Sequence, residues 1–361
     1  MTVKRKHAFP LAIALLVLLG GFYLWFRAAM HVAGLPVRTM SAEAGAQAEA
    51  QGSSRNSGAT CFDPTHRIEV PCPVVHPLVE AAHQDNVEEI ERLLVQRQDP
   101  KALTTALFAV AQSAGLVVSV TGGELKQDEA HGFHYARIAK LLLENGASID
   151  ARDQDGSTPL IAAAAYGEDD VVKLLLARGA DIEAANGAGV TALIAASCNC
   201  PIIDMADTYD SVCTLLEKGA NIEARDRRGF TALMAAADWG RERQVRLLLD
   251  WGASIDARDS HGNTALLISA SGGLYPTVDA VAALLTRGAD IEARNDNNDT
   301  PLILAASRGG FEDVKVVHLL LDRGVALSTR NKQGYTALEL ARKNGRKETA
   351  TLVSAAMAKS R

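Results

Sequence analysis

The sequence predicts an all-α solenoid of repeated helix pairs that follows one N-terminal transmembrane helix. One phrase recurs from residue 156 to the end of the chain, at intervals between 33 and 40 residues. Aromatic side chains make up only 5% of the 361 residues, whereas Ala and Leu are abundant, which favours many thin helix pairs over one bulky core. An uncharged apolar stretch lies at residues 8–26.

Each repeated unit has the chemistry of two short helices and a turn. A Thr opens the unit and is expected to cap the first helix with its side-chain oxygen. An Ala-rich stretch allows close helix contact, and a Val/Leu run supplies the apolar face of the second helix. A Gly then ends the second helix, where a left-handed residue is needed. The opening residues are Thr158, Thr191, Thr231, Thr264, Thr300 and Thr336, and the glycines are Gly146, Gly179, Gly219, Gly252, Gly288 and Gly324.

Residues 156–186, "GSTPLIAAAAYGEDDVVKLLLARGADIEAAN", resemble the ankyrin repeat, a unit of about 33 residues with the phrase T-P-L-H-x-A. The resemblance covers residues 74–361 and implies about eight repeats, each a helix-turn-helix with a β-turn or hairpin tip. Residues 77–94 are predicted to form an N-terminal capping pair. The His of the family phrase is replaced throughout, so we expect apolar packing to substitute for its hydrogen bonds. The replacing residues are Phe108, Ile161, Ile194, Met234, Leu267, Ile303 and Glu339.

The uneven repeat spacing is explained by insertions of 19, 7, 3 and 3 residues, all between the first and second helices of a unit. Because stacked units keep their orientation, these insertions are expected at one edge of the solenoid. They are either a binding feature of that edge or drift in tolerant loops.

Residues 8–26 are predicted to be an uncleaved signal-anchor, since 19 residues of helix reach roughly 28 Å, close to the thickness of a hydrocarbon core. The alternative is a cleaved signal peptide, although its apolar region is usually shorter. Lys4, Arg5 and Lys6 before the span predict a cytoplasmic tail at residues 1–7 and a repeat domain exported to the periplasm or an equivalent space. The expected location is the inner (plasma) membrane, with contact to lipid through the span.

Residues 27–73 are predicted to be a flexible linker because they are rich in Ala, Gly, Ser, Gln and Glu. Cys61 and Cys72 bracket the Pro-containing segment "CFDPTHRIEVPC" and are candidates for a disulfide in an exported compartment. The alternative is a pair of free thiols in a linker.

No residue pattern predicts catalysis, a cofactor or a metal. His131 and His134 lie near Glu129 but lack a further strong ligand at metal-site spacing. Among Cys198, Cys200 and Cys213, a disulfide from Cys198 or Cys200 to Cys213 is favoured over zinc. No nucleophile elbow or phosphate loop is present. The net charge of −6 argues against nucleic acid as a partner, and no small-molecule substrate is predicted.

The resemblance implies that a partner contacts the turn tips and the exposed end of the first helices. Tyr166, Trp239, Arg308 and Asn344 stand there at equivalent positions, with Asp238 beside Trp239. Exposed Tyr, Trp and Arg are enriched at binding hot spots. A second candidate is a basic row at one turn position, either a binding stripe or a row neutralised by the Asp or Asn that follows each member. The row comprises Arg152, Arg225, Arg258, Arg294 and Arg330.

These observations predict a non-catalytic protein-interaction scaffold or adaptor, tethered to the membrane and displayed on its exported side. The alternative function is an inhibitor or immunity-type protein that occludes a secreted enzyme or toxin. The identity of the protein partner is not encoded in a recognisable motif.

Overall fold

The computed structural model describes the repeat region almost completely. The described residues are 60–63, 68–71, 76–96, 98–112, 120–121, 124–125, 131–198, 208–272, 277–308 and 311–359. The predicted anchor at residues 8–26 lies outside them. Among the helices that are described, none combines the length and apolar character needed to cross a bilayer.

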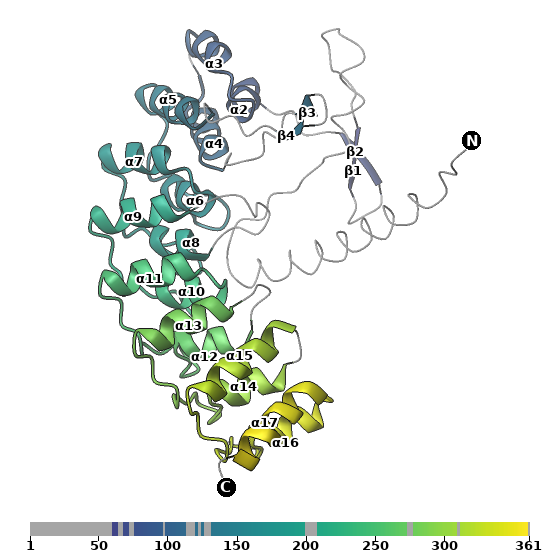
Figure 1. Ribbon diagram of the computed structural model, residues 1–361. Helices are drawn as coiled ribbons and strands as arrows, with labels where there is room; N and C mark the ends of the chain where they lie inside the picture. The colour runs from purple at the N-terminus through teal and green to yellow at the C-terminus, as the bar shows by residue number, and fades with distance from the viewer. Residues whose placement is uncertain are drawn as a thin grey trace, which may run out of the picture.

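Sixteen helices in the described part of the chain form eight consecutive antiparallel pairs (Figure 1). The pairs are α2 (Pro77–His83) and α3 (Val87–Leu94), α4 (Pro100–Ala111) and α5 (His131–Glu144), α6 (Pro159–Tyr166) and α7 (Asp169–Ala177), α8 (Ala192–Cys198) and α9 (Tyr209–Glu217), α10 (Ala232–Asp238) and α11 (Glu242–Asp250), α12 (Ala265–Ala270) and α13 (Val278–Thr286), α14 (Pro301–Ser307) and α15 (Phe311–Asp322), and α16 (Ala337–Lys343) and α17 (Lys347–Lys359). The prediction of a repeated helix-pair solenoid is confirmed.

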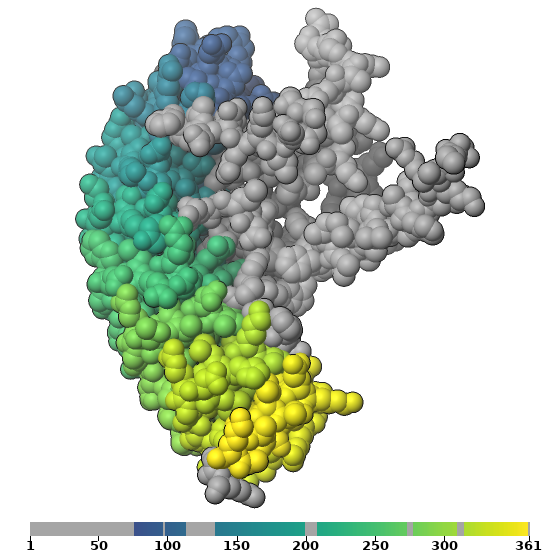
Figure 2. Space-filling view, viewed as in Figure 1, coloured from purple at the N-terminus to yellow at the C-terminus, as the bar shows by residue number. Residues whose placement is uncertain are grey.

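The pairs stack in two layers along a curved array. Each first helix packs on the first helices of the neighbouring pairs, and each second helix packs on neighbouring second helices. From the α4–α5 pair to the α10–α11 pair, the first helices lie on the inner side of the curve and the second helices on the outer side (Figure 1). Figure 2 shows the described helices as one continuous curved wall from the purple end to the yellow end. Over these four pairs the inner side is therefore lined by first helices.

The core is built from small and branched apolar side chains of the first helices. All eight residues of α6 are buried, because its Ala side chains admit helices on both sides. At the position of the family His, five side chains are at most 1% exposed: Ile161, Ile194, Met234, Leu267 and Ile303. Apolar packing at this position is confirmed for these five units. In the last unit Glu339 instead forms a capping box with Thr336.

The predicted caps are formed with one exception. Five Thr hydroxyls accept a hydrogen bond from the backbone N–H three residues later: Thr158, Thr231, Thr264, Thr300 and Thr336. The hydroxyl of Thr191 is buried without a hydrogen-bond partner. The six helix-ending glycines have φ values between 79° and 101°, and Asn298 has a φ of 59°, as the turn chemistry requires.

Helix α4 differs from the expected pattern because it begins a full turn before Thr105. Asp99 caps it by accepting from the N–H of Lys101 at 3.1 Å, and Pro100 occupies the first turn, where its missing N–H costs nothing. The hydroxyl of Thr105 donates to the carbonyl of Lys101 at 2.8 Å. An Asp-Pro start therefore sets the beginning of this helix.

Two short hairpins lie outside the helix pairs. Strand β1 (Thr60–Asp63) pairs antiparallel with β2 (Ile68–Pro71), with Cys61 opposite Val70. These strands lie within the predicted linker at 27–73, where Thr, Phe, Ile and Val favour strand formation. Cys72 lies outside the described residues, so its pairing with Cys61 stays a prediction. Strands β3 (Val120–Thr121) and β4 (Glu124–Leu125) pair within the longest insertion, between α4 and α5.

Candidate binding groove

The turn tips between successive helix pairs are fixed by one side chain in each unit. An Asp or Asn carboxylate or amide oxygen accepts hydrogen bonds from the backbone N–H groups two and four residues later. In Asp226 these bonds join Oδ1 to the N–H of Arg228 and of Phe230, each at 2.8 Å. The equivalent residues are Asp153, Asn186, Asp259, Asn295 and Asn331. The sequence repeats this acceptor because the turn depends on it.

Neighbouring turn tips are also joined to one another by backbone hydrogen bonds. The N–H of Gly187 donates to the carbonyl of Asp155 at 2.8 Å, and the N–H of Arg227 donates to the carbonyl of Ala188 at 2.9 Å. A Cβ at Gly187 would lie 2.9 Å from the Asp155 oxygen, so this close approach requires Gly. The same link continues at Ser260, Asp296 and Lys332. The tips therefore form one continuous hydrogen-bonded border along the array.

The predicted basic row is mostly engaged in the same border. The Nη1 atom of Arg225 donates to the carbonyl of Arg258 at 2.6 Å, and Nη1 of Arg258 donates to the carbonyl of Arg294 at 2.6 Å. Arg152 donates to the carbonyls of Gly156 at 2.8 Å and Ala185 at 2.7 Å, and Arg330 pairs with Glu339. These side chains are exposed, but their hydrogen bonds join adjacent units. The arginines of the row therefore stabilise the contacts between adjacent turn tips. The Asp or Asn that follows each arginine accepts hydrogen bonds within its own turn.

The candidate contact residues at the ends of the first helices differ in exposure. Arg308 and Asn344 are exposed, and Trp239 and Asp238 are half-buried. Tyr166 is only 2% exposed, so the prediction of an exposed Tyr is wrong. Helix α6 runs through Tyr166 and ends at Gly167, which keeps the ring within the packing of the array.

A group of charged side chains lies around the end of α10. Burial raises the pKa of Asp238, while the charges of Arg228 and Arg308 lower it. Arg228 also pairs with Asp226 at 3.0 Å and lies 4.2 Å from the ring centroid of Phe230. The structure thus brings the charges of Asp238 and Arg308, two candidate contact residues from different units, close enough to interact. Sequence analysis missed Arg228, although its place in the turn of the same unit was a usable signal.

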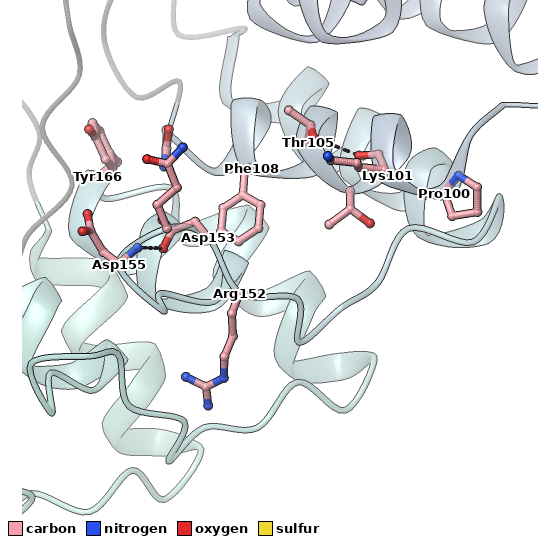
Figure 3. Close-up of a pocket in the computed structure, with 11 residues that line it drawn as sticks. Pro100, Lys101, Thr105, Phe108, Arg152, Asp153, Asp155 and Tyr166 are labelled. Atoms are coloured by element: carbon pink, nitrogen blue, oxygen red, sulfur yellow. Dashed lines mark hydrogen bonds between the residues drawn. The ribbon is translucent and has the colours of Figure 1, made fainter.

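A cleft of about 890 Å³ lies near the N-terminal end of the array, between α4 and the turn tip at residues 152–155 (Figure 3). Phe108 lies at its centre, with Lys101 and Pro100 toward one end and Tyr166 and Asp155 toward the other. The lining residues are Pro100, Lys101, Thr104, Thr105, Phe108, Gln112, Arg152, Asp153, Gln154, Asp155 and Tyr166. Sequence analysis did not identify this cleft, because its walls come from two units that the linear pattern does not bring together.

The remaining polar candidates do not form a reactive site among the described residues. The Nδ1 atom of His134 lies 3.0 Å from Oδ2 of Asp85, and the side chain of His131 lies outside the described part. In that part, no group of three or more His, Cys, Asp or Glu side chains is placed to hold a metal ion. Cys198 and Cys213 are free, so the predicted pairing of these two is wrong. Burial raises the pKa of Cys198 to about 12, and Cys200 lies outside the described residues.

Comparisons with known proteins agree with this architecture. A family model described as "Ankyrin repeats (3 copies)" matches residues 130–226, 202–295 and 276–359, which together exceed half of the chain. Among solved structures, the ankyrin repeat domain of human ASB11 is similar in fold, with a TM-score of 0.52 and 24% sequence identity over 77% of this chain and 97% of that one. No curated protein sequence matched. Ankyrin repeats are generally protein-interaction modules, and this chain belongs to the ankyrin-repeat family.

Proposed function

We propose that this protein is a non-catalytic interaction scaffold whose inner groove binds a protein partner. The observation that carries the proposal is the contrast within the groove. The repeated Asp, Asn and Arg residues of the turns form hydrogen bonds within and between units, so they hold the array together. The side chains at the ends of the first helices differ from unit to unit. Asp238, Trp239 and Arg308 supply acidic, aromatic and basic groups at these helix ends, and such groups discriminate between partners.

We further propose that the scaffold comprises about eight repeats and is tethered by residues 8–26 with its repeats in the periplasm or an equivalent exported space. The apolar composition of that segment and the preceding basic residues support this arrangement. A reporter fused to the C-terminus and active only after export is expected to be active. A reporter signal confined to the cytoplasm would overturn the proposed topology.

The binding site is tested by two Trp residues of one repeat. Trp239 ends α10 and packs partly against the core, whereas Trp251 ends α11 and is 48% exposed. Partners are cross-linked to the full-length protein, purified and identified. We expect Trp239→Ala and Arg308→Ala to weaken recovery of the main partner at least fivefold, on the order of 1 kcal/mol each, and Trp251→Ala to leave it unchanged.

Thermal unfolding of each variant provides the control for stability. Arg308 is exposed, so its substitution separates loss of contact from loss of fold. Unchanged recovery with both Trp239→Ala and Arg308→Ala would show that the groove is not the binding surface. Recovery of a secreted hydrolase or toxin, inhibited on binding, would assign the scaffold to the inhibitor class; a resident envelope protein would support the adaptor.

A further inference from the structure

Among the residues that the structure describes, no basic side chain pairs with the carboxylates at the acidic end of the cleft between α4 and residues 152–155. Asp155 is exposed and serves the turn only through its backbone, since its N–H donates to Oδ1 of Asp153 at 3.0 Å and its carbonyl accepts from Gly187. Burial raises the pKa of Asp153; hydrogen bonds from the backbone of Ser157 and Asp155 lower it, and the negative charge of Asp155 raises it by a smaller amount. Two carboxylates therefore face the same end of the cleft, and their repulsion favours a cation there.

The two basic residues of the cleft do not fill this role. Arg152 directs its guanidinium to the carbonyls of Gly156 and Ala185, and Figure 3 shows it extending away from the side chains of Phe108 and Asp153. Lys101 lies toward the opposite end, beyond Phe108 (Figure 3). Neither lowers the pKa of Asp153. The cleft is thus polarised along its length.

An aromatic surface adjoins the carboxylates. The half-buried ring of Phe108 lies at the centre of the cleft and offers this surface, whereas Tyr166, near Asp155 (Figure 3), is buried behind the wall. Carboxylate and aromatic ring together suit a guanidinium, which accepts a planar carboxylate partner and stacks on rings. A strongly hydrated ammonium gains less from the same ring.

The charge of the surrounding units points in the same direction. Residues 74–190 carry 18 acidic and 9 basic side chains, whereas residues 296–361 carry 7 acidic and 11 basic ones. The array is therefore negative around the cleft and positive at its far end. A basic segment of a partner is attracted to the N-terminal units at long range before it makes any contact.

Resting on the proposed protein-binding function, we propose that this cleft receives an arginine side chain of the partner. Its guanidinium pairs with the carboxylate of Asp155, and its aliphatic stem lies against Phe108. Lys101 at the opposite end contacts the carbonyl or acidic groups of the same segment. The cleft thus selects a partner segment that places an arginine at the α4–α6 end of the array.

The test uses N-acetyl-arginine amide as the probe and the full-length protein labelled for NMR. We expect saturable shifts in the amide signals of Gln154 and Asp155 and in the ring signals of Phe108. Asp155→Asn is expected to weaken probe binding about tenfold, as for loss of one charge-assisted hydrogen bond. The matched control is Asp322→Asn, an exposed carboxylate at the end of α15, which should bind as the unaltered protein does.

N-acetyl-citrulline amide has the same shape without the charge and is expected to produce no saturable shift. Equal shifts from citrulline, or unchanged affinity in Asp155→Asn with an intact amide spectrum, would overturn the arginine site. This outcome is distinct from failure of the scaffold function. If a partner identified by cross-linking binds Asp155→Asn as tightly as the unaltered protein, the scaffold stands and the arginine site fails.

Discussion

At the scale of single residues, the array contains a buried carboxyl that serves no cap or turn. Glu168 follows α6 and is 8% exposed. Burial raises its pKa to about 8, and the charges of Asp170 and Asp85 raise it further. Asp85 is itself paired with His134 at 3.0 Å. The junction between the first three units is therefore held best when Glu168 is protonated.

This position predicts a pH-dependent stability. Between pH 4.5 and about 8 the folded state retains a proton that the unfolded state releases, so the free energy of unfolding falls as the pH rises through this window. Glu168→Gln removes that loss. We expect the variant to match the unaltered protein near pH 5 and to exceed it at pH 9 by roughly 3–5 kcal/mol.

Urea unfolding at both pH values measures the difference, with the exposed Glu217→Gln as the control. A variant that keeps the slope of the unaltered protein between pH 5 and 9 would show that Glu168 ionises without cost in the folded state.

At the scale of elements, the turns of adjacent units are joined by arginines whose role depends on their neighbours. Arg225 and Arg294 occupy the same turn position. Arg225 donates to the carbonyls of Gly229 and Arg258, while the Arg294 guanidinium makes no hydrogen bond to another described residue. The same residue type at the same register therefore contributes differently to the joint between units.

The pair supplies its own control. Arg225→Gln is expected to lower the free energy of unfolding by about 1–2 kcal/mol, because two hydrogen bonds are lost, and Arg294→Gln by less than about 0.5 kcal/mol. Chemical denaturation of the two variants and the unaltered protein measures both changes in the free energy of unfolding. Equal losses would mean that the bonds to the carbonyls of Gly229 and Arg258 do not stabilise the array.

At the scale of the whole molecule, stability is the sum of units and of the contacts between neighbours. Leu248 in the second helix of the α10–α11 pair and Ile90 in α3 are both fully buried. Substitution by Ala costs about 2–5 kcal/mol at either site. The consequence differs, because a central unit couples the two halves and a terminal unit has neighbours on one side only.

Hydrogen exchange measured by mass spectrometry separates the two cases. Leu248→Ala is expected to raise hydrogen exchange in α8–α13. The pairs at the two ends of the array are then expected to differ from each other in their protection against exchange. Ile90→Ala is expected to raise exchange only in α2–α5. A uniform rise across all helices in both variants would show that the array unfolds as one unit.

The amino-acid sequence by itself determined the repeating architecture. Its Thr caps, left-handed glycines and apolar periodicity depend on interactions within about four residues, and the turn position of Asn298 follows from the same local rules. It also predicted four insertions between the first and second helices of a unit, and the helix bounds confirm those before α5, α9 and α13. In the α14–α15 pair the three extra residues lengthen α15 to 12 residues, so the predicted loop insertion is wrong there. Local chemistry repeated along a chain is readable without a structure.

Tertiary structure alone decided which of the predicted contact residues are exposed. Tyr166 is buried and Arg225 is bound to the next turn because units stacked on either side use their side chains. Asp238, Arg228 and Arg308 belong to different elements and meet only in the folded array. The cleft beside Phe108 likewise has walls from two units. Burial and proximity between units arise from stacking geometry, which the pattern within a single unit does not specify.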